Sequence, residues 1–250
     1  MTKVTSNEKS KILVVDDEVD IQEIIKDLFE VFGFDVTTAS SGNEAQAILE
    51  NDSFDVIISD VRMPDGSGID LLKWVRNRSL SEPKFFFITG YSDHTIPEVL
   101  DLGAEGLFAK PFEASEMREN IKKAFLTQKE RWTNLNPPVA DKALKKSYSN
   151  LEKVKENGEF NYGRGGFFIK EDPKNFAIGD LVDVELDFSD QGSFPHFKGL
   201  VEVIWVRPPG NSQDLSEGIG VEIRSVDRGV VKDYLQWVET HPVKSYIPIA

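Results

Sequence analysis

The first half of the chain alternates short apolar runs with amphipathic stretches. Residues 11–15 form an apolar run of the length typical of a buried parallel strand, and residues 21–32 then place apolar side chains at helical spacing. The same alternation predicts further strands at 34–39, 54–59, 85–88 and 107–109, and helices at 41–51, 69–75, 95–102 and 117–125. Five successive strand-helix units predict an α/β fold with a doubly wound five-stranded parallel sheet.

The pattern changes in the second half, where apolar and polar residues alternate with a period of two. Strands are predicted at 181–188, 200–206 and 219–223, and helical spacing returns at 230–238. We therefore expect a small mainly-β barrel with a C-terminal helix. The division follows as residues 1–127, a partly helical connector at 128–158, and the barrel at 159–250.

Length and composition limit the class of protein. The 250 residues are 40% apolar and 29% charged, which suits two globular domains. Apolar runs stay well below the roughly 20 residues of a membrane helix, and the first eleven residues lack the apolar segment of a secretion signal, so we expect a cytoplasmic protein without membrane insertion. The absence of cysteine excludes disulfides and thiolate chemistry.

The charge argues against nucleic acid as a partner. The formal net charge is −14, and residues 157–250 carry nine Lys and Arg against fifteen Asp and Glu. Binding to phosphate backbones depends on basic side chains that displace counterions, so an acidic second half is repelled.

Candidate chemistry gathers at the carboxyl ends of the predicted strands. Asp16 and Asp17 follow the first strand, Asp60 follows the third, and Thr89 and Lys110 end the fourth and fifth. In an open parallel sheet these ends meet at one edge, where ligands bind. Three adjacent carboxylates need a cation, and their oxygen atoms suit Mg²⁺.

This arrangement favours phosphoryl transfer to a carboxylate. Asp60 is the candidate nucleophile, with Lys110 and Mg²⁺ balancing the charge on the phosphoryl oxygens. The backbone carbonyl of Arg62 can join the metal ligands, and the hydroxyl of Thr89 can bind the new phosphoryl group and draw its own loop inward.

Four motifs in this half together resemble the receiver domain of bacterial response regulators, which has a flavodoxin-like fold. They are Val15-Asp16-Asp17-Glu18, Asp60-Val-Arg-Met-Pro-Asp-Gly-Ser-Gly68, Thr89-Gly90 and Lys110-Pro111. The resemblance implies a metal pocket at Asp16 and Asp17, phosphorylation of Asp60 by a sensor histidine kinase or phosphotransfer protein, and Thr89 and Lys110 as switch and charge partner. It also implies a cis Lys110-Pro111 bond.

The resemblance further implies how the signal leaves the domain. Phe108 matches a switch aromatic that reports to the face formed by the fourth helix, fifth strand and fifth helix, which is also a candidate homodimer surface. The domain then transfers and hydrolyses only its own phosphoryl group, so we expect no separate enzyme activity.

The second half resembles a PilZ domain in its order of strands and glycines, beginning at Asn161-Tyr-Gly-Arg-Gly-Gly-Phe-Phe-Ile169. That family implies cyclic di-GMP as ligand. Asn161, Gly163 and Gly166 fall on one of its nucleotide-binding motifs, and Arg164 is a substitute donor. However, Gly163 replaces the usual Ser, and the arginine pair of the other motif is absent.

Several outputs stay open at this stage. The leading hypothesis is a phosphorylation switch whose PilZ-like module binds a downstream protein, with cyclic di-GMP as the other ligand. A DNA-binding transcriptional regulator is the alternative, although it needs a basic surface. In a third hypothesis, phosphorylation relieves an intramolecular clamp.

Overall fold

A computed structural model of the chain describes residues 9–90, 95–133, 136–190, 194–209 and 216–249. The chain divides into two compact units. The first comprises residues 1–94 and 104–121, and the second comprises residues 95–103 and 122–250. No helix within the described ranges has the length and apolar character needed to cross a membrane.

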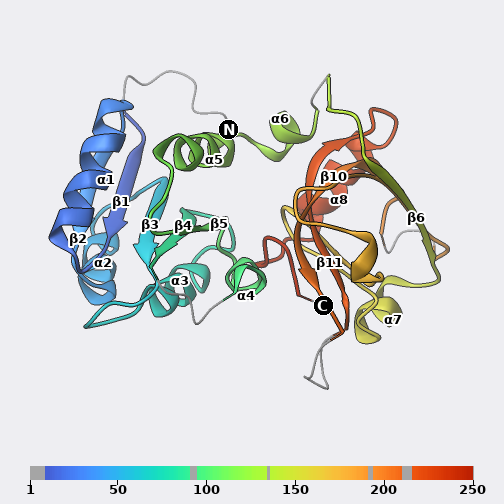
Figure 1. The fold of residues 1–250 in the computed structure, drawn as a ribbon, viewed down its shortest axis with the longest axis horizontal. Coiled ribbons are helices and arrows are strands. Elements are labelled where there is room, and N and C mark those ends of the chain that lie inside the picture. Colours follow the sequence, from blue (N-terminus) through green and yellow to red (C-terminus); the bar gives the residue numbers. More distant parts are fainter. Residues whose placement is uncertain (1–8, 91–94, 134–135, 191–193, 210–215, 250) are drawn as a thin grey trace. The chain divides into compact units, whose positions relative to one another are not determined.

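The first unit is a five-stranded sheet with strand order β2-β1-β3-β4-β5 (Figure 1). All neighbouring strands are parallel. The strands are β1 (Lys11–Val15), β2 (Asp35–Ala39), β3 (Val56–Asp60), β4 (Lys84–Thr89) and β5 (Gly106–Ala109). This doubly wound order is the flavodoxin-like one, so the predicted parallel sheet is confirmed.

Helices flank this sheet and connect its strands. They are α1 (Val19–Val31), α2 (Gly42–Leu49), α3 (Gly68–Arg76) and α5 (Ala114–Phe125), the last of which continues into the second unit. Ser41 and Ser67 directly precede α2 and α3 and cap them, because their hydroxyls accept hydrogen bonds from free backbone N–H groups of the first turn.

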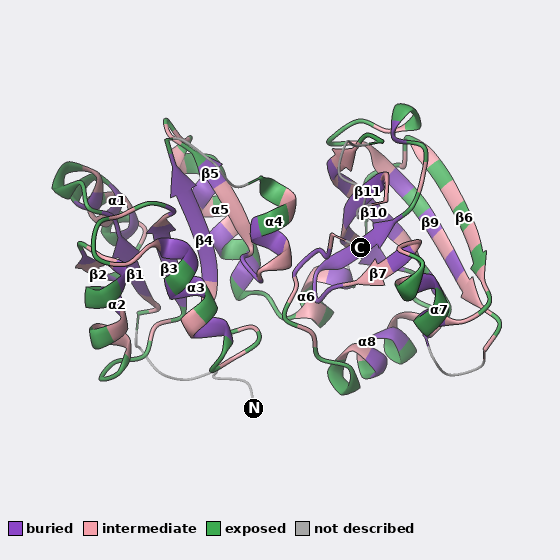
Figure 2. Cartoon of the chain, turned by 90° about the horizontal axis from the view of Figure 1, so that it is seen from below, coloured by how far each residue is buried: buried purple, intermediate pink, exposed green. Residues whose placement is uncertain are grey.

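Burial explains why the central strands form. Ile12, Leu13, Ile57 and Phe87 are fully buried, and the central strands are coloured as buried along most of their length in Figure 2. Strands covered on both faces need continuous apolar runs rather than alternating ones.

The second unit contains a six-stranded mixed sheet with strand order β6-β9-β10-β11-β8-β7, curved into a half-barrel. Its strands are β6 (Lys142–Tyr148), β7 (Phe160–Tyr162), β8 (Gly166–Ile169), β9 (Leu181–Phe188), β10 (Phe197–Arg207) and β11 (Gly218–Val226). Only the pairing of β6 with β9 is parallel among these strand pairs of the described residues.

The segment 128–158, expected to be a connector, contributes elements of its own to this unit. They are α6 (Gln128–Trp132), strand β6 and α7 (Leu151–Glu156). Trp132, Leu151 and Val154 are buried in the apolar core of this unit. Residues of the strands and of α8 (Val231–Thr240) lie in the same core. The segment 128–158, predicted to be partly helical, therefore contains a strand as well as two helices, and the short 3₁₀ helix η1 (Pro173–Asn175) follows β8.

A second apolar cluster lies apart from this core and includes helix α4 (Ile96–Asp101). Leu100 of α4 packs with Phe168, Trp205, Tyr246 and Ile247. The rings of Phe168 and Trp205 stack with centroids 5.8 Å apart. By its contacts, α4 thus belongs to the second unit, although its sequence lies between β4 and β5.

Candidate functional site

Three carboxylates meet at the carboxyl end of the parallel sheet. Asp16 and Asp17 follow β1, and Asp60 is the last residue of β3. Because β1 pairs with β3, one carboxylate oxygen of each residue lies within 4.8 Å of the others. The structure therefore brings together the three acidic residues that the sequence predicts at this edge.

The backbone around Asp16 is fixed by its neighbours. Its N–H donates to the carbonyl of Ala39 over 3.1 Å, and its carbonyl accepts from the side chain of Gln22 over 2.6 Å. The side chain is 1% exposed and accepts from the N–H of Glu18. Asp16 is thus a buried carboxylate held in one orientation.

Asp60 is positioned by the turn that follows β3. The N–H of Val61 donates to Asp60 Oδ1 over 2.7 Å, and the hydroxyl of Ser59 donates to the Asp60 carbonyl over 2.8 Å. Gly68 approaches so closely that a Cβ there would lie 2.0 Å from the Asp60 carbonyl oxygen. The first residue of α3 therefore has to be glycine for this turn to pack.

Lys110 faces the acidic cluster from the end of β5. Its Nζ lies 2.8 Å from Asp16 Oδ2, 3.2 Å from Glu18 Oε1 and 3.7 Å from Asp60 Oδ2. Its N–H donates to the carbonyl of Thr89 over 2.8 Å, which fixes the base of the side chain. Among these partners, Glu18 was given no role from the sequence. Its place in the motif after Asp17 was the available signal.

Burial and charge shift the pKa values of the facing pair. Partial burial raises the pKa of Asp60, and the nearby Lys110 ammonium only partly offsets this effect. Burial alone would lower the pKa of Lys110, but the hydrogen bond and charge of Asp16 outweigh it and raise that pKa. Lys110 therefore stays a cation at neutral pH beside the carboxylates.

The chemistry of the three carboxylates fits a divalent metal. Three oxygen donors at one edge, with Asp17 exposed to solvent, match the preference of Mg²⁺ for a few carboxylates and several waters. Asp16, Asp17 and Asp60 are the residues that would hold it.

The other residues predicted for this half lie on strands β4 and β5 and in the loop after β3. Thr89 ends β4 and is 6% exposed, and Arg62 is an exposed residue of the loop after β3. Phe108 on β5 is buried and stacks on Phe86 with centroids 5.8 Å apart. The bond between Lys110 and Pro111 is cis, as the resemblance implied.

The four residues expected to contact a nucleotide lie against the protein's own backbone. Cβ atoms at Gly163 and Gly166 would lie 2.4 Å from the Tyr246 carbonyl and 1.8 Å from the Val221 carbonyl. Arg164 is 7% exposed and donates to two backbone carbonyls of the second unit. Asn161, in β7, uses its side-chain oxygen to accept from the next N–H.

Comparison with known proteins identifies the family of the first half of the chain, helix α4 included. Residues 12–122 match the family described as the response regulator receiver domain. The chain is 37% identical over 106 residues to response regulator SaeR of Staphylococcus aureus strain USA300, an alignment that covers 42% of this chain and 46% of SaeR. The chain thus spans about half the length of the curated relatives it matches.

Solved structures give similar coverage. The chemotaxis response regulator CheY4 of Vibrio cholerae is 32% identical with a TM-score of 0.43, over 47% of this chain and 99% of that one. A receiver domain protein from Clostridium thermocellum is 36% identical with a TM-score of 0.42, over 46% and 93% of the two chains.

Residues 12–122 are therefore the receiver domain of a two-component response regulator. Such a domain implies phosphorylation-dependent signalling and a histidine kinase or phosphotransfer partner. The acidic cluster at which receiver domains typically bind Mg²⁺ is present here as Asp16, Asp17 and Asp60.

Proposed function

We propose that the chain is a cytoplasmic response regulator that accepts a phosphoryl group on Asp60 and signals through its second unit to a downstream protein. The observation that carries this proposal is the position of the Lys110 ammonium, 3.7 Å from Asp60 and 2.8 Å from Asp16. A cation beside the nucleophile can bind the phosphoryl oxygens as charge develops on them.

The reaction follows from these positions. An oxygen of Asp60 attacks the phosphorus of a phosphohistidine, the N–P bond breaks, and its electron pair returns to the imidazole, which takes up a proton. Asp16, Asp17 and Asp60 would hold Mg²⁺, which would neutralise the negative charge of the phosphoryl oxygens. Thr89 donates its hydroxyl to the transferred group, and Lys110 pairs with a second phosphoryl oxygen. The only reactions that the chain catalyses in this proposal are transfer of the phosphoryl group onto Asp60 and its hydrolysis from Asp60.

An apolar groove beside the site suits the phosphodonor protein. It has a volume of about 920 Å³ and extends from Lys110, Pro111 and Phe112 to helix α1. Ile24 and Val31 of α1 are 56% and 82% exposed. Because the groove is continuous with Lys110, a partner helix docked there brings its phosphohistidine to Asp60. Substitution Ile24→Lys is expected to slow transfer from a phosphohistidine protein while modification by acetyl phosphate is unchanged.

Mass spectrometry tests the phosphorylation itself. The full chain, given Mg²⁺ and acetyl phosphate, is expected to gain one phosphoryl group that is labile in alkali. The variant Asp60→Asn is expected to gain none, whereas Asp35→Asn, an exposed control on β2, is expected to react like the wild type. Equal labelling of the Asp60 variant would refute the proposal.

A PilZ-like output that binds a protein is supported by the half-barrel of the second unit and by the excess of acidic residues in 157–250. Calorimetric titration with cyclic di-GMP tests this choice, because micromolar binding would contradict an output that binds protein alone. A gel shift with genomic DNA fragments, before and after acetyl phosphate, tests the DNA-binding alternative. We expect no salt-sensitive complex.

A further inference from the structure

Helix α4 connects the two units through the chain itself. It begins seven residues after Thr89, the last residue of β4, and β5 begins five residues after it ends. Both ends of α4 are therefore covalently tied to strands that carry site residues. The helix nevertheless packs within the second unit.

Residues 244–249, which we call the strap, run along the half-barrel. The N–H groups of Arg164 and Gly165 donate to the carbonyls of Ser245 and Tyr246, each over 2.9 Å. A Cβ at Gly165 would lie 2.3 Å from the Tyr246 ring. A Cβ at Gly163, one of the residues that the sequence suggested for a nucleotide motif, would lie 2.4 Å from the Tyr246 carbonyl oxygen, so Gly163 and Gly165 are both needed for the strap to approach.

The strap and Arg164 bind the C-terminal end of α4. The N–H of Tyr246 donates to the carbonyl of Leu100 over 2.9 Å, and the hydroxyl of Ser245 lies 3.0 Å from both the carbonyl and Oδ1 of Asp101. Arg164 Nη2 donates to the carbonyl of Gly103 over 2.8 Å. The Leu100 carbonyl also accepts from the N–H of Gly103 over 3.1 Å, so the strap adds a second donor to it. A cation such as the Arg164 guanidinium is favourable at this end of the helix dipole.

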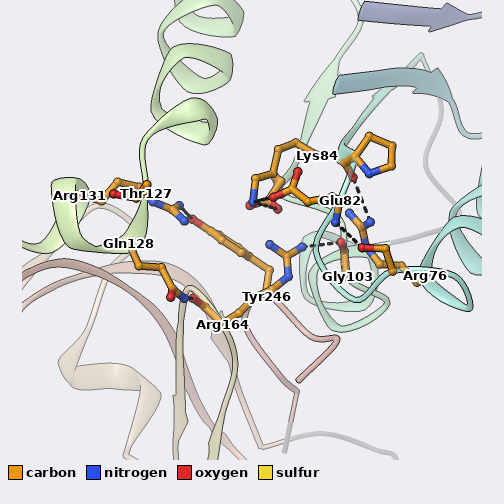
Figure 3. Close-up of polar contacts among 12 residues, drawn as sticks. Arg76, Glu82, Lys84, Gly103, Thr127, Gln128, Arg131, Arg164 and Tyr246 are labelled. Atoms are coloured by element: carbon orange, nitrogen blue, oxygen red, sulfur yellow. Dashed lines mark hydrogen bonds and ion pairs between the residues drawn. The ribbon is translucent and has the colours of Figure 1, made fainter. Parts of the chain in front are cut away.

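Tyr246 fixes the strap in turn. Its hydroxyl accepts from Arg131 Nη1 over 3.0 Å and donates to Glu222 Oε1 over 2.5 Å. Its ring lies 5.2 Å from the Arg164 guanidinium and 6.0 Å from that of Arg131. Figure 3 shows the Tyr246 side chain extending toward Arg131, with Arg164 reaching the carbonyl of Gly103. Leu100, 2% exposed, completes the contact in the second apolar cluster.

We propose that the strap and Arg164 form a latch that binds α4 when Asp60 is unphosphorylated and releases it when Asp60 is phosphorylated. This inference rests on the proposed function. Movement of the Thr89 hydroxyl toward the phosphoryl group pulls on the chain that leads into α4, so closing the latch and phosphorylating Asp60 compete. Because closing of the latch and binding of a phosphoryl group oppose each other, a variant with a weaker latch is expected to bind a phosphoryl group more tightly. The largest gain in affinity equals the factor by which phosphorylation weakens the latch.

Hydrogen exchange on the full chain measures the latch directly, because the Tyr246 amide is protected only while it donates to Leu100. Addition of Mg²⁺ and beryllofluoride, a phosphoryl mimic, is expected to accelerate exchange of this amide at least tenfold. Unchanged or slower exchange in protein that has bound the mimic would overturn the latch.

A matched pair of serine variants tests the linkage. Ser245→Ala removes the hydroxyl that binds Asp101, whereas Ser189→Ala removes a hydroxyl that donates over 3.0 Å to the carbonyl of Ser149, elsewhere in the second unit. Ser245→Ala is expected to bind beryllofluoride two- to tenfold more tightly, measured by protection of β1 and β3 amides, and the control is expected to match the wild type. Equal or weaker binding by Ser245→Ala overturns the latch.

The outcomes also separate the latch from the function on which it rests. If neither acetyl phosphate nor beryllofluoride modifies Asp60, the proposed function fails first. If Asp60 is modified while Tyr246 exchange and the Ser245→Ala affinity stay unchanged, only the latch fails.

Discussion

Replacing Gly68 by alanine introduces one methyl group against the backbone of Asp60. The added Cβ would lie 2.0 Å from the Asp60 carbonyl oxygen and 2.7 Å from the Ser59 hydroxyl. The two segments must separate by about 1.4 Å to reach ordinary contact. Overpacking of this kind costs about 1–3 kcal/mol in unfolding free energy. A displacement of about 1 Å at a reacting group slows a reaction roughly 100-fold.

Two measurements on the full chain check both magnitudes. Exchange of β1 and β3 amides as a function of urea reports the stability of the first unit, and mass spectrometry gives the rate of labelling by acetyl phosphate. Gly90→Ala is the matched control, since among the described residues the nearest atom that its Cβ would meet is Lys110 Cδ at 3.9 Å. We expect the control to keep wild-type stability and rate. If Gly68→Ala equals this control in both measurements, the steric argument is wrong.

Three further predictions concern the core, a helix start and the strap. Trp132→Ala is expected to destabilise the second unit by about 3–5 kcal/mol, because Trp132 is 1% exposed and its ring centroid lies 5.3 Å from that of Tyr234. Circular dichroism in urea measures this loss of stability, and a loss below about 1 kcal/mol would contradict the prediction. Hydrogen bonds from Ser40 lower the pKa of Glu44, so the carboxylate stabilises the fold above its unfolded pKa of about 4.3 and loses this effect as the pH falls through the lowered folded pKa. Glu44→Gln is thus expected to be less stable than wild type at pH 7 but equally stable at pH 2. A difference in stability that persists at pH 2 would show that the charge of the Glu44 carboxylate is not its cause. Gly163→Ser is expected to accelerate exchange of the Tyr246 amide, since its Cβ would lie 2.4 Å from the Tyr246 carbonyl, and unaltered exchange would count against that contact.

The parallel sheet was accessible from the sequence because its signals are local. Lys11–Val15 is found as predicted, and the strands predicted at 54–59 and 85–88 are observed as Val56–Asp60 and Lys84–Thr89. Continuous apolar runs, turn residues and the order of the units determine which strand ends meet. The approach of Asp16, Asp60 and Lys110 followed from that order alone.

The second unit was harder to predict because its contacts are distant in the chain. Strand β6 has the sequence Lys-Ala-Leu-Lys-Lys-Ser-Tyr, which its lysines make compatible with a helix. It becomes a strand by pairing with β9, where Lys145 lies opposite Glu185. Partners 40 residues away override such a weak local preference.

The contacts of Arg164 could not be predicted from the sequence for the same reason. Its neighbours Asn161, Gly163 and Gly166 suggested a ligand, and Arg164 seemed a donor for nucleotide oxygens. In the structure the guanidinium donates to the carbonyls of Gly103 and Lys244, which are 61 and 80 residues away. Backbone carbonyls at a helix end offer the same acceptor chemistry as a nucleotide, and sequence alone does not distinguish them.

The separation between α4 and the strap has a consequence for biosynthesis. Ser245 and Asp101 are 144 residues apart, and at about 5–20 residues per second the ribosome needs roughly 7 to 30 s to add that length. Strands β1 to β5 are synthesised before any residue of the strap. During this interval the receiver domain therefore lacks the contacts that the strap makes with α4. Under the proposed latch, Asp60 of the nascent chain is therefore expected to be labelled more readily than Asp60 of the finished protein.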